Sequence, residues 1–138
     1  MEKILKILAA DLSFLYRRYH FKIIDSEFSE SFGGSGYIVL IKDSMKVRLL
    51  QSRDGVFLEF GENIKNPKWY SFDVIQRLLS DEDDRKYNNV VNKLNLSSLD
   101  SGMTELLSFF SEEKIESTKK LLVDYTRERS KKLFKKKL

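Results

Sequence analysis

The chain has 138 residues, of which 41% are hydrophobic and 33% are charged, a composition typical of one soluble globular domain. It contains no cysteine, which excludes disulfides, thiolate metal sites and a cysteine nucleophile, and suits a reducing compartment. The first residues lack the uninterrupted apolar run of a signal peptide, and no window approaches about 18 uncharged apolar residues. We therefore expect a cytoplasmic protein without a transmembrane segment.

The formal net charge of +4 is unevenly distributed along the chain. Residues 127–138 hold seven basic side chains against Glu128, a net charge of +6, which leaves −2 for residues 1–126. We expect a single domain over residues 1–126, followed by a basic tail or helix extension over residues 127–138. An argument for nucleic-acid binding from overall basicity therefore applies to the tail alone.

Residues 2–19 are predicted to form an amphipathic helix, because apolar side chains recur there at spacings of three and four residues. The apolar stripe consists of Leu5, Leu8, Leu12, Leu15 and Tyr19. A first strand is expected at residues 21–29, with imperfect alternation of polarity. Its two faces would carry Ile23, Asp25 and Glu27 on one side and Lys22, Ile24, Ser26 and Phe28 on the other.

Three more strands are predicted to complete an antiparallel sheet. Residues 37–42 are nearly all apolar and β-branched, as in a central strand. Residues 45–52 alternate after a short turn, and Asp54-Gly55 favours the positive φ angles of a tight hairpin, beyond which residues 56–60 alternate again. One face of the second of these three strands would carry Met45, Val47, Leu49 and Gln51.

Helices are predicted after the sheet. Asn66-Pro67 interrupts the chain, and Ser71 can cap a helix over residues 72–79. Residues 80–103 have weak periodicity and predict a loop with a short helix near residues 87–94, whereas residues 104–134 are expected to be helical in two pieces that meet near residues 110–112. The expected fold class is α+β: an N-terminal helix, an antiparallel β-meander of about four strands, and C-terminal helices packed on one face.

No pattern in the sequence assembles a catalytic or metal site. His20 is the single histidine, so the chain lacks the ligands of a standard zinc site and the usual base of an acyl-transfer triad. The glycines near residue 34 lie between two strands and lack the Gly-Lys-Ser/Thr sequence of a phosphate-binding loop. We therefore expect no enzyme, cofactor or metal, with an unfamiliar carboxylate site for Mg²⁺ or Mn²⁺ as the remaining catalytic alternative.

Two features are candidate partner-binding patches. They are the acidic cluster Asp81, Glu82, Asp83 and Asp84, and the aromatic pair Trp69 and Tyr70. The acidic cluster lacks the spacing of an EF-hand loop; it is a solvated loop before a helix, a docking patch for a basic partner, or a site for Ca²⁺ or Mg²⁺. The aromatic pair lies among lysines and either contacts a partner or pins a loop onto the sheet.

The basic tail is the candidate nucleic-acid site. Its lysines are Lys131, Lys132, Lys135, Lys136 and Lys137. If the last helix continues to residue 138, lysines four residues apart form like-charged pairs whose repulsion a polyanion would relieve. An anionic membrane surface and an ordinary solvated helix end are the alternatives.

The block from Val47 to Leu79 contains VRLLQSRDGVFLEFG, then Pro67, Trp69-Tyr70 and FDVIQRLL. It resembles a pattern of small bacterial α+β proteins, several of which are immunity proteins of polymorphic toxin and contact-dependent inhibition systems. The resemblance covers about a quarter of the chain and rests on structural motifs, so no catalytic or binding residue is carried over. It implies a non-enzymatic protein that neutralises a cognate toxin by direct binding; the alternative is a nucleic-acid-associated protein that uses the basic tail.

Overall fold

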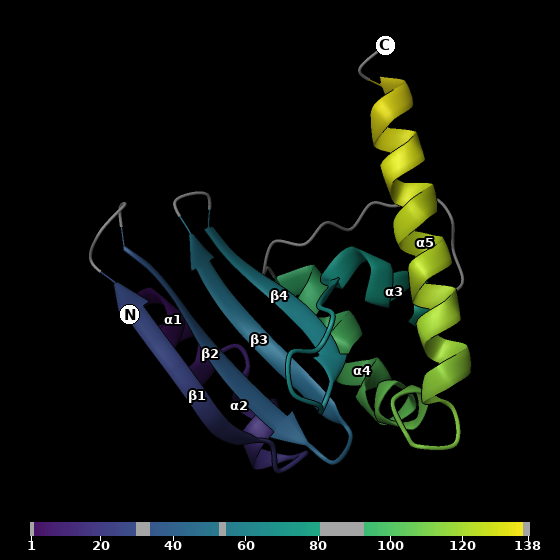
Figure 1. Ribbon diagram of the computed structural model, residues 1–138. Helices are drawn as coiled ribbons and strands as arrows, with labels where there is room; N and C mark the ends of the chain where they lie inside the picture. The colour runs from purple at the N-terminus through teal and green to yellow at the C-terminus, as the bar shows by residue number, and fades with distance from the viewer. Residues whose placement is uncertain (1, 30–33, 53–54, 81–92, 137–138) are drawn as a thin grey trace.

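The computed structural model describes residues 2–29, 34–52, 55–80 and 93–136 (Figure 1). In chain order its elements are α1 (Glu2–Ala9), α2 (Ser13–Arg17), β1 (Lys22–Ser29), β2 (Ser35–Lys42), β3 (Met45–Ser52), β4 (Gly55–Glu62), β5 (Tyr70–Ser71), α3 (Phe72–Ser80), α4 (Lys93–Phe109) and α5 (Ile115–Lys136). The expected α+β class, with N-terminal helix, antiparallel meander and C-terminal helices packed on the sheet, is confirmed. No helix in these described ranges is long and apolar enough to cross a membrane.

The sheet is a meander in the order β1-β2-β3-β4-β5, and each strand runs antiparallel to its neighbours. Asp43 takes the left-handed conformation, with φ of 53°, in the short turn between β2 and β3. The β3–β4 hairpin closes on the pair Ser52–Gly55, and Gly55 has a positive φ of 135°, as its place beside a tight turn requires. The two-residue β5 was not predicted; it forms where the chain returns to β4 and Tyr70 pairs with Phe60.

The two faces of the sheet differ sharply. On one face, the residues aligned across β2, β3 and β4 are almost completely buried, and we call this the covered face. Its two rows are Ile38–Leu49–Leu58 and Leu40–Val47–Phe60. The rows on the opposite face, Tyr37–Leu50–Phe57 and Val39–Arg48–Glu59, are half-buried apart from Val39, and we call this the open face. Figure 1 shows α1 and α2 behind β1 and β2, and the open face toward the viewer.

The first strand carries a β-bulge that changes its predicted faces. The register with β2 shifts between Ile23 and Asp25 and leaves Ile24 without a partner there. Ile23 therefore lies opposite Leu40 of the covered face, whereas Asp25 and Glu27 lie opposite residues of the open face. The prediction that Ile23 shares a face with Asp25 and Glu27 is wrong, because an extra residue reverses the alternation at that point.

The N-terminal segment forms two short helices in place of the single helix predicted over residues 2–19. The amide of Leu12 donates to the carbonyl of Ile7, a wider turn than that of an α-helix, and the break changes the phase of the apolar stripe. Ile4 is consequently buried, and Leu5, which was predicted to lie in the stripe, is 49% exposed. The other predicted stripe residues face the core or pack against it.

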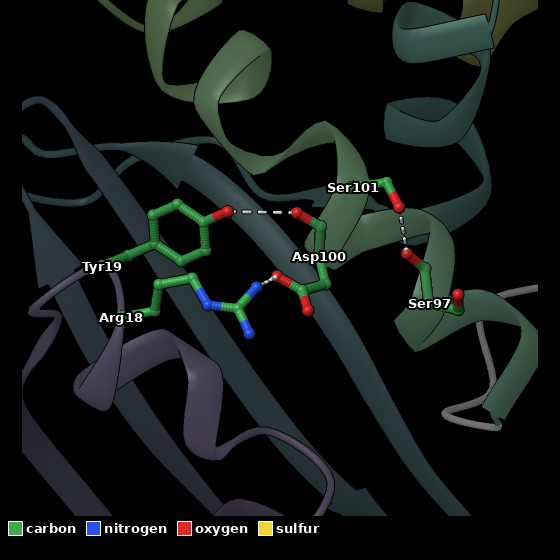
Figure 2. A network of polar contacts seen from close by, with 5 residues as sticks. All are labelled: Arg18, Tyr19, Ser97, Asp100 and Ser101. Atoms are coloured by element: carbon green, nitrogen blue, oxygen red, sulfur yellow. Dashed lines mark hydrogen bonds and ion pairs between the residues drawn. The ribbon is translucent and has the colours of Figure 1, made fainter.

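The end of α2 is tied to the middle of α4 by polar contacts (Figure 2). The Arg18 guanidinium lies 2.7 Å from the Asp100 carboxylate, and the Tyr19 hydroxyl donates to the Asp100 backbone carbonyl at 3.2 Å. Next to Asp100, the Ser101 hydroxyl donates within α4 to the carbonyl of Ser97 at 3.0 Å. The contacts of Arg18 and Tyr19 with Asp100 join the chain at the end of α2 to a helix that follows the sheet.

Close packing joins α3 to α4. A Cβ on Gly102 would lie 2.8 Å from a methyl carbon of Leu79, so a larger residue there would separate the two helices. The loop predicted over residues 80–103 is wrong from residue 95 onward, since α4 runs from Lys93 to Phe109. The short helix predicted near residues 87–94 overlaps α4 at residues 93–94, and its residues 87–92 lie outside the described residues. The predicted division near residues 110–112 is confirmed by the end of α4 at Phe109 and the start of α5 at Ile115.

A polar seam attaches α5 to α3. The largely buried Asp73 carboxylate pairs with Arg129, and the Arg77 side chain pairs with Glu128. The Arg77 guanidinium also lies 4.2 Å from the centre of the Tyr125 ring. Beyond this seam α5 continues to Lys136, and Figure 1 shows its yellow end extending well past the sheet.

Candidate functional site: the open face of the sheet

An arginine held between a carboxylate and an indole ring forms the centre of the open face. Arg48 of β3 lies directly opposite Glu59 of β4, and its Nε and Nη2 donate to Glu59 Oε1 at 2.9 and 2.6 Å. The guanidinium carbon lies 4.3 Å from the centre of the Trp69 ring. The Arg48 and Glu59 side chains are 25% and 20% exposed, so the pair is partly shielded from water and its net charge is zero. This arrangement is a rigid, neutral platform with one broad aromatic group.

A glycine positions the aromatic side of this platform. A Cβ on Gly61 would lie 3.0 Å from the Lys68 carbonyl oxygen and 3.3 Å from a carbon of the Trp69 ring. The absence of a side chain therefore lets the segment before β5 lie directly against β4. The Lys46 ammonium, on the strand next to Gly61, donates to the carbonyl of Ile64 at 2.9 Å and ties the same connection to β3. Trp69 is thus placed by contacts to two strands.

The β1 side of the open face is acidic. The Tyr37 hydroxyl lies 3.2 Å from a carboxylate oxygen of Asp25 and 3.2 Å from one of Glu27. One hydroxyl has a single proton to donate, so two negative groups share one donor. Partial desolvation raises the pKa of Tyr37, and the two carboxylates raise that pKa further. Tyr37 therefore stays neutral at physiological pH, and the local charge is negative.

Apolar side chains connect the acidic side to the central platform. Leu50 and Phe57 are half-buried and extend the row that starts at Tyr37, whereas Val39 is 6% exposed between them and β1. Ile41 continues the apolar surface at the other end of β2. Apolar side chains at the surface with polar groups around them are the usual composition of a protein-binding patch.

The predicted aromatic pair is divided between the two faces. Trp69 is half-buried on the open face, but Tyr70 is 6% exposed and pairs with Phe60 of the covered face. Burial raises the pKa of Tyr70, the nearby Lys119 lowers it and Glu62 raises it. The open face therefore offers Trp69 to a partner and very little of Tyr70.

The predicted acidic cluster, Asp81 to Asp84, lies outside the described residues. Within the described ranges no group of three or more His, Asp or Glu side chains is arranged to hold a metal ion. His20 is exposed in the turn between α2 and β1, with φ of 61°.

Four of the five predicted nucleic-acid residues belong to α5. Lys131, Lys132, Lys135 and Lys136 lie within the helix, and Lys137 lies outside the described residues. Lys131 is exposed. The neighbouring Arg129 is already engaged by Asp73, and Arg127 lies 3.8 Å from the exposed Asp124. The basic residues are therefore presented by a helix that is anchored to the body at its base.

Residues that the sequence did not single out contribute most of the open face. Arg48 and Glu59 lie equally far from the β3–β4 turn, and an Asp-Gly hairpin with the register Ser52–Gly55 makes them direct neighbours. That signal was available in the sequence. The position of Trp69 over Gly61 was not, because it depends on how the connection after β4 returns to the sheet.

Comparison of the chain with models of known protein families found no match, and neither curated proteins nor solved structures yielded one.

Proposed function

We propose that this chain is a non-enzymatic protein-binding module, most concretely a bacterial immunity protein that acts in the cytoplasm. It would neutralise a cognate toxin by direct binding, through the open face of its sheet. The observation that carries this proposal is the platform of Arg48, Glu59 and Trp69, surrounded by apolar side chains on an uncovered face. The partial resemblance of residues 47–79 to immunity proteins supports the same function.

The chemistry of the platform suits stoichiometric binding. Tryptophan and arginine dominate the energetics of protein interfaces, where truncation of a central residue often costs about 2 kcal/mol or more. Arg48 is already partly shielded from water and paired, and Trp69 is already in contact with Gly61 and Arg48. Little side-chain freedom is therefore lost when a partner binds, which favours affinity.

The charge of the face indicates which surface of a toxin it would cover. Asp25 and Glu27 make its β1 side negative, and residues 1–126 together carry a charge of −2. A basic active site or entry channel on the toxin would be attracted to this side, and such steering raises the association rate. The immunity protein would then act as a plug that excludes the toxin's substrate.

The proposal is tested by capture followed by a growth assay. Tagged full-length protein is incubated with lysate of the native host, with and without nuclease, and a protein retained at near-equal stoichiometry is identified. We expect that protein to stop growth when expressed alone, and co-expression of this chain to restore growth. We expect Trp69→Ala to lose most of the protection and Leu5→Ala, a change at an exposed apolar residue of α1, to keep it. A retained protein without toxicity would refute the immunity function.

A second function, nucleic-acid binding through α5, is favoured by one observation. The helix is continuous to Lys136, so Lys131 and Lys135, and likewise Lys132 and Lys136, are four residues apart on one helix. About six phosphate contacts should give a log–log slope of affinity against salt near −5. Deletion of residues 131–138 should abolish that binding; persistence of the same slope in the deletion variant would exclude α5 as the site.

A further inference from the structure

The two edges of the sheet are protected very differently. At one edge, β5 has two residues and α3 follows it directly. At the other edge, β1 has eight residues, seven of them exposed, and within the described part of the chain no strand pairs with its outer side. A long strand with an unpaired row of backbone donors and acceptors is a template for another strand. We call this outer side of β1 the β1 edge.

The β1 edge has two features that oppose strand addition, a bulge and charged side chains, but it is long and largely exposed. It contains no proline, and its one lysine, Lys22, stands at its first position. Ile23 and Ile24 are 56% and 48% exposed, although isoleucine is among the residues most often found inside proteins. The bulge at Ile24 is followed by regular pairing with β2 from Asp25 to Ser29, so five consecutive residues keep strand geometry.

The charges along β1 select the kind of strand that fits. Asp25 and Glu27 lie on the open face, two residues apart, and both carboxylates approach the Tyr37 hydroxyl. Side chains of an added strand would face them at alternate positions, because side chains in a strand alternate between faces. Opposite charges in directly facing positions stabilise a strand pair, and like charges destabilise it.

We propose that the β1 edge binds an extended segment of a partner protein that has Lys or Arg at alternate positions, facing Asp25 and Glu27, and apolar residues between them. The inference rests on the proposed protein-binding function and adds the chemistry of the partner. The apolar residues of the partner segment would lie on the same side of the sheet as Ile23 and Phe28, which belong to the covered-face side of β1. Main-chain hydrogen bonds supply affinity and the alternating cations supply specificity.

A second copy of this chain fits the β1 edge poorly. Two-fold antiparallel pairing centred on Ser26 places Asp25 of one copy against Glu27 of the other, and pairing centred on Asp25 places the two Asp25 side chains together. Both arrangements set like charges directly opposite each other. The same acids therefore oppose self-association and favour a basic strand.

The test uses the folded full-length protein and a random dodecapeptide library displayed on phage. Selections are run on the wild type, on Asp25→Lys/Glu27→Lys, and on the control Glu112→Lys/Glu113→Lys, which makes the same charge change at two exposed acids in the turn before α5. We expect wild type and control to enrich Lys or Arg at i and i+2 with apolar residues between them. The β1 variant should instead enrich Asp or Glu at those positions, which also shows that it has folded.

A synthetic peptide with a sequence enriched on the wild type is then used to measure the binding affinity and to locate the binding site on the protein. Its affinity for the β1 variant should fall by about tenfold or more, because two attractive cross-strand pairs become repulsive. Hydrogen exchange should slow at amides of β1 in the complex. The inference would be overturned if all three selections yielded the same peptides, or if none showed the alternating enrichment. Slowed hydrogen exchange confined to α5 would also overturn it, as would a wild-type dimer that the β1 variant disrupts.

The β1 variant also separates this inference from the proposed function. If a toxin retained from the host is bound equally by wild type and by Asp25→Lys/Glu27→Lys, the β1 edge is not its site and the immunity function stands. If no host protein is retained while alternating basic peptides bind at β1, the immunity function fails and the strand-binding edge stands.

Discussion

The two faces of one sheet have the same strands and very different surroundings. Phe60 and Phe57 are both phenylalanines of β4 on opposite faces; Phe60 is fully buried in the core, and Phe57 is half-buried on the open face. The covered face is sealed by helices and holds the fold together. We expect the open face to contribute less to stability, and our proposal is that it serves recognition. Truncation of the same type of side chain should therefore mainly lower stability on the covered face and mainly lower partner affinity on the open face.

The largest difference is expected between Phe60→Ala and Phe57→Ala. Phe60→Ala should lower the free energy of unfolding by about 3–5 kcal/mol, because it leaves a cavity in the core. Phe57→Ala should cost less, about 1–2 kcal/mol, since part of its ring is already in contact with water. Urea denaturation followed by circular dichroism measures both. Equal losses would show that the open face is as structural as the covered face.

The ion pairs test the same division. Arg129→Ala removes the ion pair of the largely buried Asp73 and should cost about 1–3 kcal/mol. Arg18→Ala removes a pair in which the arginine side chain is 62% exposed, and should cost less than about 1 kcal/mol. Asp73→Asn combined with Arg129→Ala should recover part of the first loss. Thermal and urea unfolding of the four proteins provide the comparison, and no recovery in the double variant would contradict the pairing.

A smaller structural effect is expected for Gly61→Ala. The added methyl group would press on the Lys68 carbonyl and the Trp69 ring, so the connection must move away from β4. We expect a loss of about 1–2 kcal/mol, in the usual range for overpacking. Trp69 is the single tryptophan, so its fluorescence emission should shift to longer wavelength as the ring gains water. Unchanged emission would mean that the ring does not depend on the glycine.

The smallest effect concerns the protonation of Tyr37. Its folded-state pKa is raised, so this tyrosine contributes stability that is present below its unfolded value of 10.0 and is lost as pH rises through the folded value. Asp25→Asn/Glu27→Gln should lower the pKa of Tyr37 toward 10.0 without reaching it, because partial desolvation remains. Carbon-13 spectra of labelled tyrosine measure this pKa, with Tyr37→Phe as the assignment control. A pKa unaffected by both substitutions would contradict the contact with the acids.

Most of the fold was predictable because its signals are local. Alternation in residues 45–52 and the turn at Gly55 define the β3–β4 hairpin, and the periodicity of residues 72–79 defines α3. The break between α1 and α2 and the bulge at Ile24 were missed, since each depends on how neighbouring elements pack. Helix α4 was missed from residue 95 to residue 103 because Asn95 and the serines of this stretch are typical of loops.

A smaller part of the candidate site than of the fold could be predicted from the sequence. Trp69 and Tyr70 were predicted together as a partner-binding pair, and the sequence did not separate Trp69 on the open face from Tyr70, which faces the core; partner binding by either residue stays a prediction. Arg48 and Glu59 were not singled out, although hairpin register makes them neighbours, and the grouping of Asp25, Glu27 and Tyr37 depended on the bulge. Side-chain direction in a strand changes with a single inserted residue, so binding faces are harder to predict than the strands themselves.

The assignment of recognition to the open face is tested most directly by calorimetry with the purified host protein that the chain retains. We expect one-to-one binding by the wild type, an affinity for Trp69→Ala lower by about 30-fold or more, and an unchanged affinity for Leu5→Ala. Equal affinities for all three proteins would place the binding surface elsewhere and contradict the assignment.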